Sequence, residues 1–548
     1  MKIELIWRLA DETQGRLTMM KKYFKKEHLI ISSFLLLGGI FAFENIKLLD
    51  FWLDEAAVYI AIKNSFWDLG KVTADYAQQF LHNFLVKIWT LIFGDSPASI
   101  RGFSSFCYLL LIPATYKAGS YFFKDKKIGL LAAYLMTTSY FAIWYSIEAK
   151  TYTLAALFGL LSFYFFIKSA REPGKKNYLF YFISSSLGFY AHPWLILIFG
   201  SQIMSLLIFR KHFSKIVRLL FVQFLISFSA IPFIILTLSQ GKLGINSYAG
   251  TVGWSVLFKS FSYLSFGESW AYLAFTLIAL FFVMKEKLPL KNIFERIFFG
   301  NLPKGECEKK KPMTASQKEE LRMNAMLLLY LFVPMFLAAA VSHFTPAYVL
   351  GRYEITVLPA FLLILANLWL KIKEKFWLFA IGIVLLCFAF SNIISYRENI
   401  ESYRSTEKTV MSHIYSEAKS GDYIVTTDLS WATTYYYSSL MKSDKKINLA
   451  AYPSQIASQV VWMNREEMDK SENREKYEKE ADLIVEKIKN DPNASQIFVM
   501  YGSSRPINQM LKNKFDQNFE LAEEYYPEAP REPAWYDYVI IYKKPQSK

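Results

Sequence analysis

The sequence predicts a polytopic α-helical membrane protein that carries an α/β domain at its C-terminal end. The chain has 548 residues, of which 53% are hydrophobic and 18% aromatic, an unusual composition for a soluble protein of this length. Apolar runs of about 18 to 24 residues recur between residues 29 and 395, and each can cross about 30 Å of hydrocarbon. The alternative is a large soluble helical core. It is disfavoured because core helices rarely stay apolar on every face.

Short loops rich in lysine and arginine predict how the chain threads the membrane, because such loops mark the cytoplasmic face. They cover residues 21–26, 124–127, 171–176, 210–218, 285–322 and 371–375. These loops hold much of the formal net charge of +15, so the charge does not call for a nucleic-acid partner. We therefore place residues 1–27 in the cytoplasm. The first span has no small-residue cleavage site and is expected to stay as an anchor.

About eleven transmembrane helices place every basic loop on the same side. They are expected at residues 29–45, 102–123, 128–146, 151–168, 178–191, 194–209, 215–238, 257–284, 325–342, 353–370 and 376–395. Residues 47–99 then form an outer loop, in which 55–67 and 79–93 have the pattern of helices that lie on the membrane surface. The long basic loop 285–324 is cytoplasmic. Together these elements define a transmembrane domain at 28–396.

Residues 397–548 have a different character, with strand-like and helical patterns in alternation. The strand-like segments are 422–428, 447–452, 496–501 and 536–542, and the helical ones are 431–440 and 465–489. Such alternation indicates an α/β domain, and about 140 residues suffice for one core. The threading places this domain on the outer side of the membrane.

Three acidic residues next to predicted spans are the main candidates for chemistry. Asp54 and Glu55 follow the first span, and Glu148 ends the third, all on the outer side. Acids this close to hydrocarbon are costly and are by default functional, and a general base needs a carboxylate that desolvation can tune. The alternatives are an interfacial cap or ion pair for Asp54 and Glu55, and a structural pair between Glu148 and Lys150.

Basic and aromatic residues on the same side are candidates for binding a phosphate. Arg101 opens the second span and Arg352 the tenth, and a guanidinium matches the oxygens of a lipid phosphate. Snorkelling toward the interface is the other explanation for both arginines. Lys150 and Tyr152 follow Glu148 and are also able to hold a phosphate.

The histidines and cysteines give no metal-binding pattern. His82, His192 and His343 all fall near the outer face, and with the acids they offer possible ligands for a divalent metal, but their spacing fits no motif. The three cysteines, Cys107, Cys307 and Cys387, have neither metal spacing nor a disulfide framework.

Four stretches of the sequence carry a resemblance to a known family. They are Trp52-Leu53-Asp54-Glu55-Ala56; the surface helix with His82, Trp89 and 93–96 leading into Arg101; residues 144–152; and Gly351-Arg352-Tyr353 with Pro359. In order and spacing, residues 29 to about 395 resemble a GT-C glycosyltransferase. The most similar branch is the dolichyl-phosphate-mannose-protein mannosyltransferases of glycosyltransferase family 39, which includes the lipid A aminoarabinose transferases.

The resemblance implies roles for individual residues. Asp54 would be the catalytic base with Glu55 beside it, and Glu148 would position the acceptor or the base. The residues implied for the donor phosphate are Arg352, Lys150, Arg101 and Tyr353, and those implied for the substrate pocket are His82, Tyr152 and His343. The chain departs from the family in two places: it has His82-Asn83-Phe84 where relatives often have His-Pro-Pro, and Lys150 where an arginine is frequent.

The expected function is therefore that of an inverting glycosyltransferase at the outer face of the cytoplasmic membrane. It would move a sugar from a polyprenyl-phosphate donor to a protein, a lipid or a cell-envelope glycan, with the bilayer as its surroundings and no nucleic acid involved. The sequence identifies no cofactor with certainty, and a divalent metal is one way to stabilise the leaving phosphate. A transporter or lipid flippase is the main alternative and would need acids buried in mid-span and an internal repeat, which the sequence lacks. A non-catalytic scaffold is a further alternative.

Overall fold

The structure is a computed structural model of the 548-residue chain. It describes residues 26–44, 46–47, 50–69, 80–212, 215–241, 259–260, 263–264, 314–342, 351–371, 383, 394, 407–427, 430–441, 444–457, 470–501, 506–527 and 538–545. The predicted spans 257–284 and 376–395 lie almost entirely outside the described residues, as does His343.

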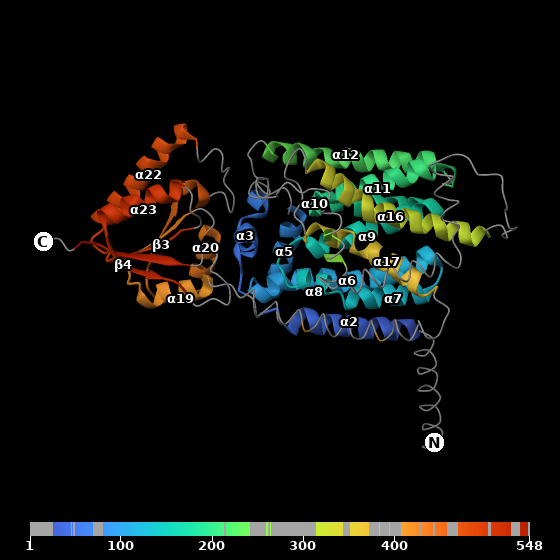
Figure 1. Cartoon of the computed structure of the whole chain (residues 1–548), viewed down its shortest axis with the longest axis horizontal. Coiled ribbons are helices and arrows are strands. Elements are labelled where there is room, and N and C mark those ends of the chain that lie inside the picture. The colour runs from blue at the N-terminus through green and yellow to red at the C-terminus, as the bar shows by residue number, and fades with distance from the viewer. Residues whose placement is uncertain are drawn as a thin grey trace, which may run out of the picture.

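A bundle of helices forms the larger part of the molecule (Figure 1). Its elements are α2 (Lys26–Glu44), α6 (Pro97–Phe123), α7 (Lys126–Thr137), α8 (Tyr140–Ser146), α9 (Tyr152–Arg171), α10 (Lys175–Ala191), α11 (Leu195–Ile208), η2 (Arg210–His212), α12 (Ile216–Gly241), α16 (Ala315–Val341), η3 (Tyr353–Thr356) and α17 (Leu358–Trp369). Helix α9 lies at the centre, and most of its residues are buried. Two further helices, α3 (Leu53–Lys63) and α5 (Phe80–Phe93), cover one end of the bundle.

Several helices are long and apolar enough to cross a membrane, which supports a multi-pass membrane protein. Among the described residues these are α2, α9 and α16, and the pair α7 and α8 makes a fourth if it is one bent span. Other predicted spans coincide with the shorter or less apolar helices α6, α10, α11, α12 and α17. The count of about eleven spans remains a prediction.

The predicted span 128–146 is divided between two helices, α7 and α8. Helices α7 and α8 meet at an angle of 56°. The break is stabilised by side chains: the Tyr108 hydroxyl donates to the Thr137 carbonyl (2.7 Å), and Ser139 caps α8 by accepting from the Ala142 amide (3.3 Å). These bonds pair backbone groups that a bend would otherwise leave unpaired in an apolar environment.

Segments predicted to share the cytoplasmic side meet at one end of the bundle. Lys124 after α6 and Arg171 at the end of α9 both pair with Glu319 in the first turns of α16, at 3.0 and 3.2 Å. Arg171 also donates to the carbonyls of Tyr121 and Phe122. The opposite end of the bundle carries α3, the loop 147–151 and the turn at 351–353. The predicted threading is therefore consistent with the arrangement of these helix ends.

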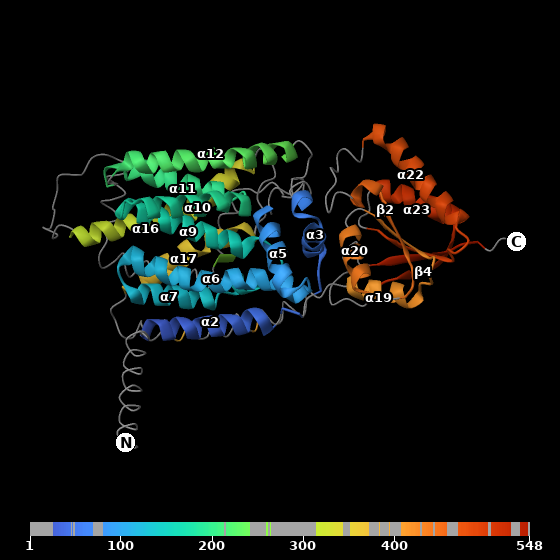
Figure 2. The same ribbon diagram turned by 180° about the vertical axis from the view of Figure 1, so that it is seen from behind.

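Residues 407–545 form a second unit around a five-stranded sheet. Its strands are β1 (Tyr423–Thr427), β2 (Asn448–Tyr452), β3 (Gln496–Met500), β4 (Glu520–Tyr525) and β5 (Val539–Lys543), in the order β2-β1-β3-β5-β4. Strand β1 is parallel to β2 and β3, whereas β5 is antiparallel to β3 and β4. The helices around it are α19 (Glu407–Glu417), α20 (Ser430–Leu440), η4 (Ser454–Ala457), α22 (Ser471–Asn490) and α23 (Pro506–Asn518). Both views place α20 next to α3 (Figures 1 and 2).

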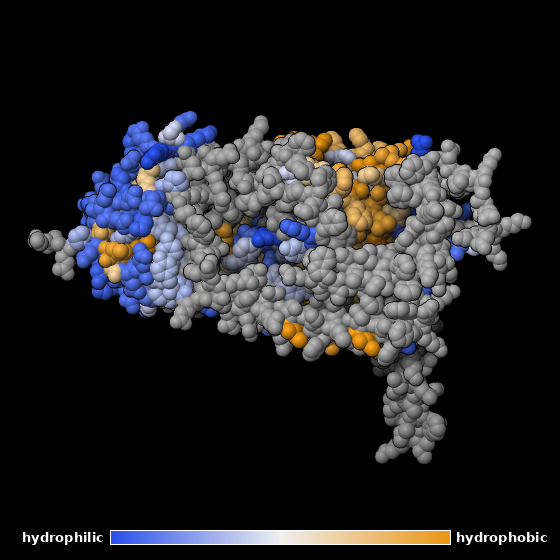
Figure 3. All heavy atoms as spheres, viewed as in Figure 1, coloured by the Kyte–Doolittle hydropathy of each residue, from blue (hydrophilic) through white to orange (hydrophobic). Residues whose placement is uncertain are grey.

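The two units differ in their surfaces. The sheet-containing unit is mainly hydrophilic in the view of Figure 3, while hydrophobic residues gather over α12 and its neighbours in the bundle. Val217, Phe221, Phe224 and Phe228 of α12 are all exposed. An apolar patch of this kind on a helix surface suits contact with lipid.

Candidate active site

The segment around residue 54 begins helix α3 at the end of the bundle. The backbone amides of Glu55 and Ala56 donate to the Trp52 carbonyl, both at 3.0 Å, which closes the first turn. Two carboxylates in this turn suit the positive end of the helix dipole. The two side chains nevertheless have different surroundings. Glu55 is buried with Arg101, whereas Asp54 contacts Lys150 and Arg352.

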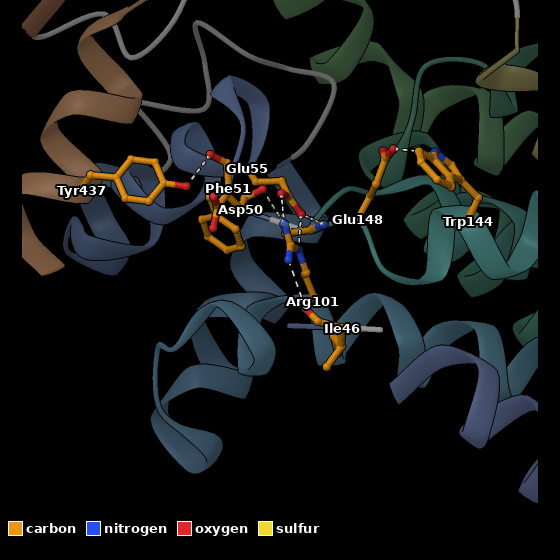
Figure 4. A network of polar contacts seen from close by, with 9 residues as sticks. Ile46, Asp50, Phe51, Glu55, Arg101, Trp144, Glu148 and Tyr437 are labelled. Carbon is orange, nitrogen blue, oxygen red and sulfur yellow. Dashed lines mark hydrogen bonds and ion pairs between the residues drawn. The ribbon is translucent and has the colours of Figure 1, made fainter. Parts of the chain in front are cut away.

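Glu55 and Arg101 form a buried, two-point ion pair (Figure 4). Arg101 Nε lies 2.8 Å from Glu55 Oε1 and Arg101 Nη2 lies 2.5 Å from Glu55 Oε2, and both side chains are only 1% exposed. The remaining guanidinium donors bind the carbonyls of Ile46 and Asp50, both at 3.0 Å. Glu55 Oε1 also accepts from the Ala149 amide at 2.8 Å.

This geometry favours a structural role for both members of the pair. The donors of Arg101 are directed at Glu55 and at the 46–50 backbone, which leaves the guanidinium badly placed to bind a donor phosphate as the family resemblance implied. Glu55 is also buried, so it is poorly placed to take a proton from a substrate. The alternative raised for Glu55 from the sequence, an ion pair, is the arrangement that the structure contains.

Asp54, Lys150 and Arg352 form a second charge cluster. Asp54 Oδ2 lies 3.4 Å from Lys150 Nζ and 3.5 Å from Arg352 Nη1. Lys150 is buried, and burial lowers its pKa, with the positive charge of Arg352 acting in the same direction against the attraction of Asp54. The Arg352 side chain is 36% exposed and lies over the Trp52 ring, 5.3 Å from its centroid. Arg352 therefore has open surface from which to meet a ligand.

Glu148 lies near this cluster but points elsewhere. Its Oε1 accepts from the Trp144 indole at 2.9 Å, and Figure 4 shows it directed away from the Glu55–Arg101 pair. Burial raises the pKa of Glu148 to about 7. The negative charges of Glu55 and Asp54 add to this, and Arg352 opposes it. A carboxyl with this pKa changes its charge near neutral pH, as an acid–base group at a reaction centre does.

Side chains of neighbouring helices fix the loop that carries Glu148 and Lys150. Ser104 donates to the Lys150 carbonyl (3.0 Å), Ser105 to the Ser146 carbonyl (2.8 Å), and Thr151 to the Ala191 carbonyl (2.8 Å). All three bonds are buried. These bonds attach the loop to α6 and to the end of α10, and so fix the backbone positions from which Glu148 and Lys150 extend.

Three further predicted residues, Tyr152, Tyr353 and His82, lie within the described part of the chain. The Arg352 guanidinium also approaches the Tyr152 hydroxyl, at 3.5 Å. Tyr353 packs edge-on against His192 with ring centroids 4.7 Å apart, so it supports the site through its ring. His82 is fully buried; its Nδ1 lies 3.4 Å from Asn83 Oδ1, and among the described residues its Nε2 has no hydrogen-bond partner.

Glu354 is a buried acid that the sequence analysis overlooked. Its Oε1 accepts from the Gly351 amide (3.2 Å) and from the Ser260 hydroxyl (2.9 Å), which closes the turn that presents Arg352. Gly351 has a φ of +79°, and a Cβ there would lie 2.8 Å from the Tyr263 ring, so both conformation and space require glycine. Its position in the sequence could have identified it, since Glu354 is also an acid at the start of an apolar run.

No group of three or more potential metal-ligating side chains occurs in the part of the chain that the structure describes. The residues present there that can neutralise a phosphate are the cations Lys150 and Arg352. A divalent metal has no built site among these residues.

Comparisons with known proteins bear on the family and the fold of the chain. A family model described as dolichyl-phosphate-mannose-protein mannosyltransferase matches residues 78–236. Among solved structures, ArnT from Cupriavidus metallidurans in the apo state is similar with a TM-score of 0.56 and 11% identity, over 94% of this chain and 98% of that chain. The same protein bound to undecaprenyl phosphate is similar with a TM-score of 0.51 and 9% identity, over 95% and 98% of the two chains. No curated protein matches the sequence.

The family match and the similarity in fold indicate a membrane glycosyltransferase. The resemblance predicted from the sequence is thereby confirmed: the chain is similar to the dolichyl-phosphate-mannose-protein mannosyltransferases within residues 78–236, and to ArnT in fold over nearly its whole length.

Proposed function

We propose that the protein transfers a sugar from a polyprenyl-phosphate donor to a hydroxyl or amine acceptor, with Asp54 as the base. The observation that carries this proposal is the position of Asp54. Its carboxylate lies between two cations, Lys150 and Arg352, that come from separate parts of the chain. A base beside a phosphate-binding pair is what a single displacement at a lipid-phosphate-linked sugar requires.

The cations account for the leaving-group side of the reaction. As the acceptor attacks the anomeric carbon, the bond to the lipid phosphate breaks and negative charge grows on the phosphate oxygens. Lys150 is buried and offers a fixed charge. Arg352 is partly exposed, and its planar guanidinium has two N–H groups able to meet two phosphate oxygens. Positive charge held where negative charge develops lowers the barrier.

The carboxylates account for the acceptor side. Asp54 takes the proton from the acceptor hydroxyl or amine as the new bond forms, and one displacement inverts the anomeric centre. Glu148, whose pKa is about 7, orients the acceptor through its carboxylate next to the Trp144 indole. In this proposal His82 and Tyr152 supply neutral hydrogen-bonding groups near the charge cluster.

The donor class has support from the comparisons. ArnT has been solved with undecaprenyl phosphate, and the matching family is named for a dolichyl-phosphate-linked sugar. We assign the same chemical class of donor to this chain: a sugar on a long polyprenyl phosphate. The acceptor is a protein, a lipid or a cell-envelope glycan.

The predicted topology places this reaction at the outer face of the cytoplasmic membrane. In this proposal, residues 28–396 form the catalytic membrane domain, 1–27 and 285–324 are cytoplasmic, and 397–548 form an extracytoplasmic α/β domain. The basic helix ends that meet at Glu319 support a cytoplasmic location for the end opposite Asp54.

The test is transfer by purified protein from a panel of polyprenyl-phosphate sugars, with release of the lipid phosphate as the readout. Asp54→Asn should lower kcat by about 10² to 10⁴-fold. Because the substitution leaves Lys150 and Arg352 without their carboxylate partner, donor binding should be as tight as in the natural protein or tighter.

The matched control is Asp95→Asn, the same change at an exposed residue of the same outer segment. It should leave turnover unchanged. Wild-type turnover by a well-folded Asp54→Asn protein would refute the role of Asp54 as the base. Absence of lipid-phosphate release with every polyprenyl-phosphate sugar would refute the donor class.

A further inference from the structure

Helix α20 of the C-terminal unit packs directly on the segment that leads into Asp54. The Tyr437 hydroxyl donates to the Phe51 carbonyl at 3.0 Å, across 386 positions of the chain (Figure 4). The Tyr436 ring stacks on the Phe51 ring, with centroids 4.8 Å apart and planes 27° apart. Farther along α3, the Tyr59 hydroxyl lies 3.2 Å from the Ser439 hydroxyl. These contacts join the C-terminal unit to the start of the outer segment.

The same contacts continue into the buried ion pair. The Arg101 guanidinium lies 4.9 Å from the Phe51 ring centroid, so Phe51 is held between Arg101 and Tyr436. Arg101 binds the Asp50 carbonyl on one side of Phe51 and the Glu55 carboxylate on the other. Phe51, Tyr436 and Arg101 are among the largest fully buried side chains of the described residues.

We propose that α20 is a positioning element for the reaction, in which Tyr436 and Tyr437 hold the 50–55 segment so that Asp54 stays between Lys150 and Arg352. This inference rests on the proposed function of Asp54. Residues 50–52 precede the first residue of helix α3, so the contacts of Phe51 with helix α20 and with Arg101 bear directly on where this segment lies. The C-terminal unit supplies one side of that contact and Arg101 the other.

The requirement for such support is geometric. A misplacement of a reacting group by about 1 Å can cost about 10²-fold in rate. Asp54 lies at the very start of a helix, where a shift of the preceding segment moves it directly. The ion pair of Lys408 with Asp50, at 3.6 Å, also joins the two units, but its side chains are 59% and 27% exposed and it adds little. The aromatic contacts of α20 are therefore the ones to test.

The experiment measures kcat and the donor KM of the full-length protein with the polyprenyl-phosphate sugar that supports turnover. Tyr437→Phe removes one hydroxyl and should lower kcat about five-fold, the effect of one hydrogen bond. The double variant Tyr436→Leu/Tyr437→Phe should lower kcat about 10²-fold, with the donor KM within about two-fold of the natural value, because Lys150 and Arg352 stay in place. Tyr436→Phe, which keeps the ring, should recover most of the turnover that Tyr436→Leu loses.

Tyr435→Phe is the matched control: it makes the same change on an exposed residue of the same helix and should leave kcat unaltered. Hydrogen exchange of peptides covering residues 50–64 reports positioning without activity. It should be faster in the double variant, while exchange in strands β1 and β3 stays as in the natural protein.

Natural kcat and natural exchange in the folded double variant would overturn the proposal, as would a change in donor KM alone or an equal loss in Tyr435→Phe. Faster exchange throughout β1 and β3 would assign the contacts to stability of the C-terminal unit, and would equally overturn it. Asp54→Asn in the same assay separates failure of the positioning role from failure of the proposed function. If Asp54→Asn is inactive and the tyrosine variants are fully active, only the positioning role fails; if Asp54→Asn is active, the proposed function itself fails.

Discussion

Replacing Arg101 by methionine would remove the cation that neutralises Glu55 while keeping an unbranched side chain of comparable width. Glu55 is 1% exposed, and of its described contacts the Ala149 amide would still donate to it. The carbonyls of Ile46 and Asp50 would also lose their donors. The variant therefore leaves a buried carboxylate without its cation, next to Asp54 in the chain.

The expected loss of folding stability follows from this burial. Breaking a buried ion pair by removing one partner costs about 3 to 5 kcal/mol, because the remaining charge stays desolvated. That is a large fraction of the net stability of about 5 to 15 kcal/mol typical of a folded domain. The double variant Glu55→Gln/Arg101→Met should recover at least half of the loss, since no charge is then left buried alone.

The assay is unfolding of the purified protein in detergent, followed by tryptophan fluorescence. The matched control is Asp95→Asn, which breaks the pair between Lys63 and Asp95, whose side chains are 45% and 51% exposed. An exposed pair contributes about 0 to 1 kcal/mol. If Arg101→Met unfolds with the same midpoint as Asp95→Asn, or if the double variant is no more stable than Arg101→Met, the buried pair does not hold this end of the bundle.

Three further predictions concern the charge cluster. The pKa of Glu148 is raised to about 7 from a usual 4.5, so its contribution to stability should fall as pH rises from about 5 through 7, and kcat/KM should rise over the upper part of that range as the carboxylate forms. Glu148→Gln should flatten both pH profiles. A transition near pH 7 that persists in this variant would contradict the assignment. Arg352→Met should raise the donor KM at least ten-fold. The control Arg218→Met changes an exposed arginine at the start of α12 and should leave the donor KM unaltered. Equal donor KM values in the two variants would exclude a phosphate role for Arg352. Gly351→Ala should also raise the donor KM, because a φ of +79° and the Tyr263 ring oppose a Cβ, and natural donor saturation in this variant would show that the turn tolerates a side chain.

Local patterns in the sequence were enough to predict most helices and strands. Apolar runs coincide with α2, α6, α9, α10 and α11, because hydrophobicity over about 20 residues is a property of the segment itself. Four predicted strand segments coincide with β1, β2, β3 and β5. Strand β4 was missed, because Glu520–Tyr525 lies at an edge of the sheet, and its sequence is half glutamate and almost entirely exposed. The bend after Thr137 was missed because side chains of another helix stabilise it.

The candidate site shows the same division. Its acids and cations were all next to apolar runs, where the cost of burying a charge makes them conspicuous. Their pairing was not visible: the sequence placed Glu55 beside Asp54 as a catalytic partner and Arg101 on the phosphate. Glu55 instead binds Arg101, 46 positions away, while Asp54 meets Arg352, 298 positions away.

The sequence by itself determined that this chain is a multi-pass membrane protein and that it resembles a class of glycosyltransferases, and it predicted which charged residues lie near the membrane surface. Hydropathy and charge are properties of neighbouring residues, so a linear reading captures them. Only the tertiary structure decided which carboxylate is enclosed in a structural pair and which one faces Lys150 and half-exposed Arg352. It also decided that the C-terminal unit contacts the segment before Asp54. These outcomes depend on how distant helices pack, because the free energy of a charge is set by the burial and partners that packing creates.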